Sequence, residues 1–372
     1  MMRCTTFVTA MGWILTAASA FGADPPGLKT LGIGASAPDF KLPGVDGRDY
    51  SLKDFANARL LLIVFTCNHC PTAQAYEARI AQLHADYKDK GVALVAISPN
   101  DPKAVRLDEL GYTDLSDSFA EMKLRAKDRK YAFPYLYDGE AQKTALAYGV
   151  VATPQVFLFD KERTLRYVGR IDDSDVKTVT SQDARNAVEA LLAGKPVPVE
   201  KTRVFGCSTK WADKQEEARK SLGKWDQEPV TLETIDEAGI GKLVKNDTKK
   251  LLLINVWASW CGPCVAELPE FVTMNRMYRR RPFQLITLSL DAPEKKEAAL
   301  ETLKEHHVAA TNFLVTIPNR DKLADLLDKE WPGPVPYTLL IAPGGKVLYR
   351  KSGAIDPLEV KRAVVDYLGR TY

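Results

Sequence analysis

The feature that most constrains this chain is a pair of closely spaced cysteines that occurs twice, each time after an apolar run and before an amphipathic stretch. Cys261 and Cys264 flank Gly-Pro in INVWASWCGPCVAELPEF, and Cys67 and Cys70 lie in FTCNHCP. A disulfide between residues so close in sequence closes a very short loop and stabilises a fold little. We therefore interpret both pairs as sites of redox chemistry or metal binding.

The N-terminal residues have the pattern of an export signal, which bears on the state of the thiols. Residues 1–23 contain Arg3, a mostly apolar stretch from Phe7 to Ala18, and small residues suited to cleavage. We predict that they form a signal peptide, with an uncleaved N-terminal anchor as the alternative. The mature chain is then expected in the periplasm or outside the cell, without a stable membrane span, where disulfides can persist.

Length, charge and motifs restrict the function classes. A chain of 372 residues is expected to form two domains. Its net charge of +3 is too small to indicate a nucleic-acid partner. The sequence has no glycine-rich phosphate-binding motif and no attachment motif for flavin, nicotinamide or haem. We therefore predict no cofactor and expect electrons to come from a separate thiol protein.

Two segments of similar layout follow one another along the chain. In each, an apolar strand precedes the cysteine pair, a helix follows it, and a strand–turn–strand unit with a final helix closes the segment. This alternation predicts an α/β fold with a central mixed β-sheet flanked by helices. The expected strands are 60–65, 92–98, 156–159, 165–169, 251–257, 283–290, 337–341 and 346–351, and the expected helices are 72–90, 181–193, 265–279, 294–307 and 356–368. Residues 101–148 are interpreted as an elaboration of the first segment.

A cysteine at the junction of a strand and a helix is suited to thiol–disulfide exchange. Unpaired N–H groups at a helix N-terminus carry partial positive charge, which lowers the pKa of a nearby thiol and favours the thiolate. A second cysteine one turn into the helix can attack the mixed disulfide and release the product. Cys261 and Cys264 have this layout, and Pro263 suits the first helical turn because no N–H donor is needed there.

The motif WASWCGPC resembles the active-site signature of the thioredoxin superfamily, and the following VAELPEF is similar to exported thioredoxin-like proteins of the TlpA/ResA type. This resemblance covers about residues 230–372. It implies that Cys261 is the nucleophile and Cys264 the resolving thiol. It also implies that the bond between Val335 and Pro336 is cis, faces the disulfide and borders the substrate-binding backbone.

The same resemblance implies a carboxylate close to the thiols, and Glu267 occupies that position. One departure is visible, because the buried aspartate of thioredoxin, six residues before the first cysteine, is Asn255 here. We therefore expect Glu267 to be the proton relay, with a raised pKa if it is buried. The alternative is an exposed carboxylate in the first turn of the helix.

The first segment, about residues 28–199, resembles the redoxin (AhpC/TSA-like) branch of the thioredoxin superfamily. The similarity is carried by APDF, DGRDYSL, FTCNHCP, VALVAISPND and ATPQVFLFD. It implies two thioredoxin-like folds in tandem, and it implies that Thr153 and Pro154 form the cis-proline position at a substrate-binding edge. We thus expect a signal peptide at 1–23, a redoxin-like domain at 28–199, a linker region at 200–228 and a TlpA/ResA-like domain at 229–372.

The first cysteine pair differs from the second in composition and in register. His69 lies between the two cysteines, where it can stabilise a thiolate and make this pair a stronger oxidant than one that brackets Gly-Pro. When the apolar strands are aligned, Cys70 rather than Cys67 falls opposite Cys261. Either the loop of the first domain is shortened, or Cys70 is the nucleophile, so the order of the two cysteines stays open.

Two other functions and one further cysteine are also considered. Thiol peroxidase activity is one alternative, although neither Cys67 nor Cys70 is preceded by the P-x-x-x-[TS]-x-x-C pattern of peroxiredoxins. A zinc or copper module built from Cys67, His69, Cys70 and either Cys207 or the second pair is the other, although no metal is predicted. Cys207 itself is interpreted either as a small buried apolar residue or as a third redox thiol that resolves the first domain.

We therefore predict an exported thiol–disulfide oxidoreductase with two active cysteine pairs. Its expected partners are thiol- and disulfide-bearing proteins of the cell envelope and a separate thiol electron donor.

Overall fold

The computed structural model describes residues 24–372. The predicted signal peptide, together with Cys4, lies outside the described residues. Within residues 24–372, no helix combines the length and the apolar character needed to cross a bilayer.

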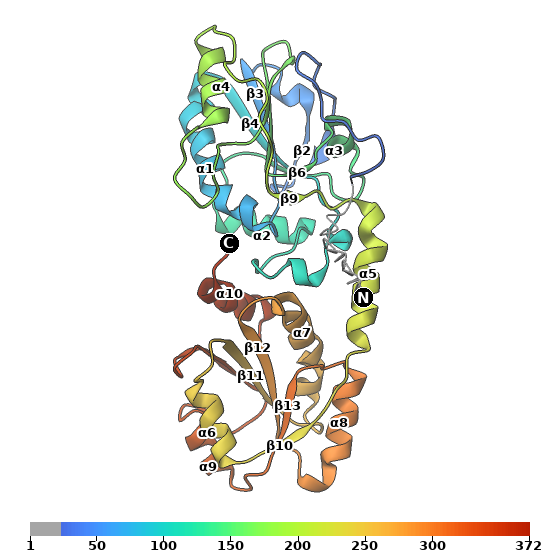
Figure 1. The fold of residues 1–372 in the computed structure, drawn as a ribbon, viewed down its shortest axis with the longest axis vertical. Coiled ribbons are helices and arrows are strands. Elements are labelled where there is room, and N and C mark those ends of the chain that lie inside the picture. Colours follow the sequence, from blue (N-terminus) through green and yellow to red (C-terminus); the bar gives the residue numbers. More distant parts are fainter. Residues whose placement is uncertain (1–23) are drawn as a thin grey trace, which may run out of the picture.

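Two α/β units lie one above the other, and helix α5 (Gln215–Asp226) runs along one side between them (Figure 1). The first unit is built on a five-stranded mixed sheet in the order β5-β4-β3-β7-β8. The first three of these strands are parallel, and β7 and β8 are antiparallel to their neighbours. The strands are β3 (Leu60–Phe65), β4 (Val92–Ser98), β5 (Tyr135–Tyr137), β7 (Gln155–Phe159) and β8 (Leu165–Gly169).

Helices cover both faces of the first sheet, which explains the apolar composition of its central strand. All six residues of β3 are buried, as expected for a strand with both faces covered. Its even-numbered residues pack with α1, α2 and α4, and its odd-numbered residues pack with α3 and the N-terminal loops. These helices are α1 (Pro71–Tyr87), α2 (Phe119–Asp128), α3 (Lys143–Tyr148) and α4 (Asp183–Leu192). The hairpin β1 (Lys41–Pro43) and β2 (Asp49–Ser51) and the short pair β6 (Ala152–Thr153) and β9 (Cys207–Ser208) complete the unit.

The second unit is built on a six-stranded mixed sheet in the order β10-β13-β12-β11-β14-β15. Helices α7, α8 and α10 pack on one face, and α6 and α9 pack on the other. The strands are β10 (Glu233–Ile235), β11 (Leu251–Trp257), β12 (Phe283–Ser289), β13 (Thr311–Val315), β14 (Tyr337–Ile341) and β15 (Val347–Ser352). The helices are α6 (Glu237–Lys245), α7 (Gly262–Tyr278), α8 (Lys296–Glu305), α9 (Arg320–Leu327) and α10 (Pro357–Leu368).

The predicted fold class, two tandem thioredoxin-like folds with central mixed sheets flanked by helices, is confirmed. Residues 101–148 are more than an elaboration, because β5 within them is an edge strand of the first sheet. The expected domain limits stay a prediction. Within the expected linker region, however, β9 pairs with β6 of the first unit.

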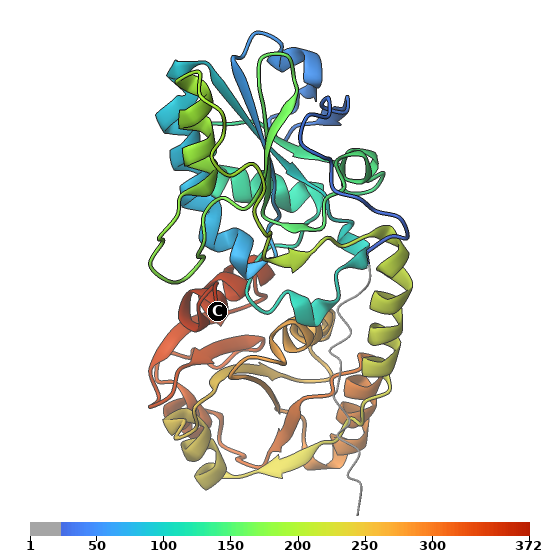
Figure 2. The same ribbon diagram turned by 45° about the horizontal axis from the view of Figure 1, so that its top comes forward.

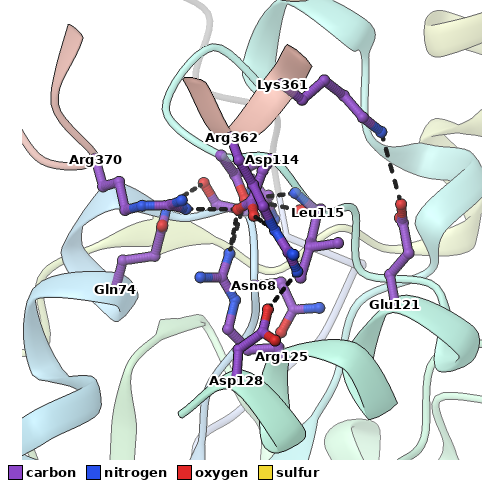
Figure 3. A network of polar contacts seen from close by, with 12 residues as sticks. Asn68, Gln74, Asp114, Leu115, Glu121, Arg125, Asp128, Lys361, Arg362 and Arg370 are labelled. Carbon is purple, nitrogen blue, oxygen red and sulfur yellow. Dashed lines mark hydrogen bonds and ion pairs between the residues drawn. The ribbon is translucent and has the colours of Figure 1, made fainter. Parts of the chain in front are cut away.

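The loop before α2 contacts the second unit through a buried carboxylate, Asp114 (Figure 3). Asp114 accepts hydrogen bonds from Arg125 at 3.1 Å, from Arg362 at 3.3 Å and from Arg370. Arg125 belongs to the first unit, whereas Arg362 lies in α10 of the second unit and Arg370 follows that helix. The ion-pair network therefore fixes the C-terminal end of the chain against the first unit, and Figure 2 shows this proximity.

Candidate active site

The second cysteine pair lies where β11 ends and α7 begins. Cys261 is the N-cap residue of α7 and forms a disulfide with Cys264. The loop before the helix is held by Ser259, whose N–H and hydroxyl donate to the buried carboxylate of Asp291 at 3.0 and 2.7 Å. Cys264 is fully buried and Cys261 is 7% exposed, while the neighbouring Trp260 is 63% exposed. A large apolar surface thus flanks the more accessible cysteine of this pair.

The backbone around a cis-proline lies beside this disulfide. The bond between Val335 and Pro336 is cis, as the family resemblance implies. Val335 packs in the same apolar cluster as Cys261 and Cys264. Among the described residues, no backbone hydrogen bond involves Val335. Its N–H and C=O groups can therefore pair with an added strand.

A buried carboxylate lies next to the second pair. Glu267 is 7% exposed and receives hydrogen bonds from Asn255 Nδ2 at 3.0 Å and from Ile355 N at 3.2 Å. Burial raises the pKa of the Glu267 carboxyl, although these two donors act in the opposite direction. The alternative of an exposed Glu267 is wrong. The amide of Asn255, which stands in the position of a family aspartate, contacts the carboxylate directly.

The first cysteine pair is placed differently relative to its helix. Cys70 is the N-cap residue of α1, so it occupies the position that Cys261 has in α7, while Cys67 lies in the loop before it. The Sγ atom of Cys70 accepts from Ala73 N at 3.4 Å, and the Sγ atom of Cys67 lies 3.1 Å from the hydroxyl of Thr153. Both cysteines are free thiols here and both are buried.

The two thiols of the first pair differ in acidity. Burial raises the pKa of the Cys67 thiol well above its ordinary value, and its hydrogen bond with Cys70 adds to this effect. Burial also acts to raise the pKa of Cys70, but hydrogen bonds from Cys207 and Cys67, the charge of His69 and the N–H of Ala73 outweigh it. The pKa of Cys70 therefore lies well below its ordinary value. Of the two thiols, Cys70 is the one whose thiolate form is favoured.

His69 belongs to a buried charged pair that sequence reasoning missed. Its Nδ1 lies 2.6 Å from Oδ2 of Asp117, and both side chains are almost inaccessible. Asp117 also accepts from the backbone N–H groups of Asn68 and His69 and from Asn100 Nδ2, at 2.8, 3.0 and 2.7 Å. Burial lowers the pKa of His69, but the carboxylate of Asp117 outweighs it and the pKa is raised. Asp117 therefore favours the protonated form of His69, which places a positive charge beside Cys70.

Cys207 is brought against the first pair by strand β9. Cys207 is opposite Thr153 in the antiparallel pairing of β9 with β6, next to the cis bond between Thr153 and Pro154. Its backbone N–H donates to the Sγ atom of Cys70 at 3.3 Å, and its side chain packs against both other cysteines. Cys207 is only partly buried, so its interpretation as a small buried apolar residue is not supported, and its role as a third redox thiol stays a prediction.

The structure gathers the predicted residues into two separate sites. The site of the first unit contains Cys67, His69, Cys70, Thr153, Pro154 and Cys207. The site of the second unit contains Cys261, Cys264, Glu267, Val335 and Pro336. Among the described residues, the potential metal-binding atoms that lie together are those of Cys67, His69 and Asp117, within 4.8 Å of one another. His69 Nδ1 already bonds to Asp117 at 2.6 Å, so we do not identify these residues as metal ligands.

Comparison with known proteins identifies the family. Residues 33–168 and 227–350, more than half of the chain, match the model of the AhpC/TSA family. The chain belongs to the AhpC/TSA family. This membership agrees with the resemblance inferred from the sequence, and both matched ranges contain one of the cysteine pairs.

Individual relatives of this AhpC/TSA chain match only part of it. The thiol-disulfide oxidoreductase ResA of Oceanobacillus iheyensis is 26% identical over 136 residues, which are 36% of this chain and 60% of that protein. ResA of Bacillus subtilis is 27% identical over 106 residues, 28% of this chain and 55% of that protein. The chain thus spans less than two thirds of the length of these two relatives. Among solved structures, a hypothetical protein from Sinorhizobium meliloti 1021 is 36% identical, with a TM-score of 0.45, and the match covers 50% of this chain and 97% of that one.

Proposed function

We propose that this protein is an exported thiol–disulfide oxidoreductase that exchanges disulfides through Cys261/Cys264 and through Cys67/Cys70. The observation that carries the proposal is the disulfide at the N-terminus of α7, beside the unpaired backbone of Val335. The AhpC/TSA membership and the names of the ResA relatives support it. The N-terminal pattern of residues 1–23 supports export, and the domain limits 28–199, 200–228 and 229–372 belong to the same proposal.

The second site performs exchange in two displacements. The thiolate of reduced Cys261, stabilised by the helix N-terminus, attacks one sulfur of a client disulfide, and the other client sulfur leaves as a thiolate that takes up a proton. Cys264 then attacks Cys261, which frees the second client sulfur and forms the Cys261–Cys264 disulfide. Glu267 lies one turn after Cys264 on the same side of α7, where it can accept the Cys264 proton. A thiol protein must return two electrons to complete the cycle.

A protein client is the substrate that suits this second site. The N–H and C=O groups of Val335, which have no backbone partner within residues 24–372, can pair with an extended client segment, and the exposed ring of Trp260 can pack on it. The proposed clients are disulfide- or thiol-bearing proteins of the cell envelope.

The first site is the more oxidising of the two in this proposal. A thiolate stabilised in the reduced form makes the corresponding disulfide easier to reduce, and Cys70 is stabilised by His69 and by helix α1. We propose Cys70 as the nucleophile of the first pair and Cys67 as its partner. Peroxidase activity and metal binding remain the alternative functions of this unit, and hydrogen peroxide consumption and metal analysis of the purified reduced chain test them.

The decisive experiment traps a mixed disulfide at the second site and compares two variants, one for each cysteine. Cys264→Ser should accumulate a mixed disulfide with insulin, because Cys261 attacks and nothing resolves the intermediate, while Cys261→Ser should trap none. Wild-type protein should accelerate the reduction of insulin by dithiothreitol. The pH at which reduced Cys261 is half-alkylated should lie below about 8.5, the value of a free thiol. A Cys261 that titrates as a free thiol and traps no insulin would refute the proposal.

A further inference from the structure

A cavity of about 460 Å³ lies between the two units, against the first cysteine site. This volume is in the range of small-molecule sites. Its wall includes His69, Cys207, Lys210 and, from the second unit, Arg281 and the C-terminal Tyr372. Cys67 and Cys70 do not line it, and both are buried. Cys207 is therefore the thiol of the first site that faces the cavity.

Strand β9 closes the edge at which a protein client would pair with the first unit. The approach is close, since a Cβ on Gly206 would lie 2.1 Å from the carbonyl oxygen of Thr153, at a φ of 140° that favours glycine. The partner of Thr153 in the β pairing is Cys207 of the same chain. The equivalent backbone in the second unit, at Val335, is unpaired among the described residues. The first unit thus already holds an internal strand with a cysteine where the second offers an open edge.

We propose that the cavity binds a small thiol, or its disulfide, that carries a carboxylate, and that Cys207 transfers the exchange between this ligand and Cys70. The inference rests on the proposed thiol–disulfide function and adds to it the substrate class and a third reacting residue. It assigns protein clients to the second unit and small molecules to the first.

Recognition of a carboxylate follows from the groups that line the cavity. His69 is 1% exposed and lines the wall, and its Nε2 has no hydrogen-bond partner among the described residues. Because Nδ1 is held by Asp117, the N–H at Nε2 of the protonated ring is the donor left for a ligand. Five basic side chains against three acidic ones line the cavity, which favours an anionic ligand.

The exchange balances with the three cysteines and two small thiols. In the oxidised unit, Cys207 attacks Cys70 of the Cys67–Cys70 disulfide, and the leaving Cys67 sulfur takes the proton that Cys207 lost. A small thiol RSH then loses its proton to solvent, attacks Cys207 from the cavity and expels Cys70 as a thiolate. A second RSH attacks the mixed disulfide, which releases RSSR and restores the Cys207 thiol. The protein gains two electrons and two RSH are oxidised to RSSR, and every step can run in reverse.

The test uses the full chain carrying Cys261→Ser and Cys264→Ser, so that only the first unit reacts. The reduction of its Cys67–Cys70 disulfide is followed by alkylation and mass spectrometry, with glutathione and with cysteamine, a small thiol of opposite charge. Adding Cys207→Ser should slow reduction by glutathione at least about tenfold, because an adjacent intramolecular thiol is lost. Ser221→Ala, a change on α5 outside the cavity wall that removes no thiol, should leave the rate unchanged. Glutathione should outpace cysteamine after both rates are scaled to a model disulfide.

A second measurement does not depend on rates. When Cys67→Ser is added to the chain with Cys261→Ser and Cys264→Ser, glutathione disulfide should link Cys70 to Cys207 and so join the tryptic peptides 60–79 and 204–210. When Cys70→Ser is added to this chain as well, the two peptides should not be joined. An unchanged rate in Cys207→Ser, or no link in Cys67→Ser, overturns the inference and leaves the proposed exchange activity intact. Equal scaled rates for the two thiols overturn the carboxylate-binding part. A parent chain whose first pair exchanges with no thiol at all overturns the proposed function of this unit as well.

Discussion

Replacing Asp117 by Asn tests the electrostatic basis of the first site. Asp117 accepts four hydrogen bonds, two at each carboxylate oxygen. The amide oxygen of Asn can keep the two backbone N–H groups, but its NH₂ group then faces the donors His69 Nδ1 and Asn100 Nδ2. His69 can adapt by giving up its Nδ1 proton and accepting a bond, which makes it neutral. Asn100 cannot adapt and loses an acceptor.

The size of the effect follows from these contacts. One unsatisfied buried donor at Asn100 costs about 1–3 kcal/mol of stability. Loss of the positive charge on His69 removes one of the groups that lower the pKa of Cys70, and a neighbouring charge typically shifts a pKa by about 1–3 units. Stabilisation of the thiolate then weakens by about 1.4–4 kcal/mol. The reduction potential of the first pair should fall by about 30–90 mV.

The measurement is a redox titration of the Cys67/Cys70 pair in glutathione buffers, together with the pH dependence of Cys70 alkylation, in the chain with Cys261→Ser and Cys264→Ser. Asp138→Asn is the matched control, because Asp138 is also a buried carboxylate of the first unit but bonds to the N–H groups at the start of α3. Asp138→Asn should change the stability of the protein and leave the reduction potential of the Cys67/Cys70 pair unchanged. If Asp117→Asn leaves both the potential and the alkylation midpoint of Cys70 unchanged, the proposed charge relation between His69 and Cys70 is wrong.

Three further predictions concern the second unit and the interface. Burial raises the folded-state pKa of Glu267, so the stability that its proton provides is complete below the unfolded pKa of about 4.3 and is lost as pH rises through the folded pKa. Glu267→Gln should remove this pH-dependent loss of stability in urea titrations across that pH range. A pH profile of stability equal to that of the wild type would contradict this prediction. Asp114→Asn should lower the unfolding free energy by about 3 kcal/mol. This is near the low end for a broken buried ion pair, because Arg125 keeps a second carboxylate partner, Glu77, at 3.5 Å. Chemical denaturation measures the change, and a value below about 0.5 kcal/mol would contradict the prediction. Trp260→Ala should weaken insulin turnover at the second site with little loss of stability, since the ring is largely exposed; equal turnover by both proteins would rule out a role of the ring in client binding.

The local parts of both sites follow from the sequence because local chemistry determines them. Helices α1 and α7 begin at cysteines followed by proline at the first or second position, which suits a helix start. Gly91 ends the first helical stretch at a φ of 81°. The long apolar strands are found at the expected positions, because burial on both faces requires continuous apolar runs.

The remaining parts depend on contacts between distant residues, which one sequence does not reveal. Asp117 meets His69 across 48 positions, in a polar stretch with no strand or helix periodicity that would draw attention to it. Strands β5 and β10 have three residues each, too short for a period-two pattern. Strand β9 has two residues, so only its pairing with β6 in the structure places Cys207 beside Cys70.

The two sites use the same position at a helix N-terminus and differ in what surrounds it. In the second unit the other cysteine, Cys264, lies inside the helix, and the backbone beside the disulfide is open. In the first unit the other cysteine, Cys67, precedes the helix, and strand β9 closes the neighbouring edge with a thiol of its own. A client segment that pairs at Val335 would therefore find its counterpart at Thr153 occupied. In the proposed function, access to the thiols therefore separates the partners of the two units, whereas the charged pair of His69 and Asp117 separates their reduction potentials.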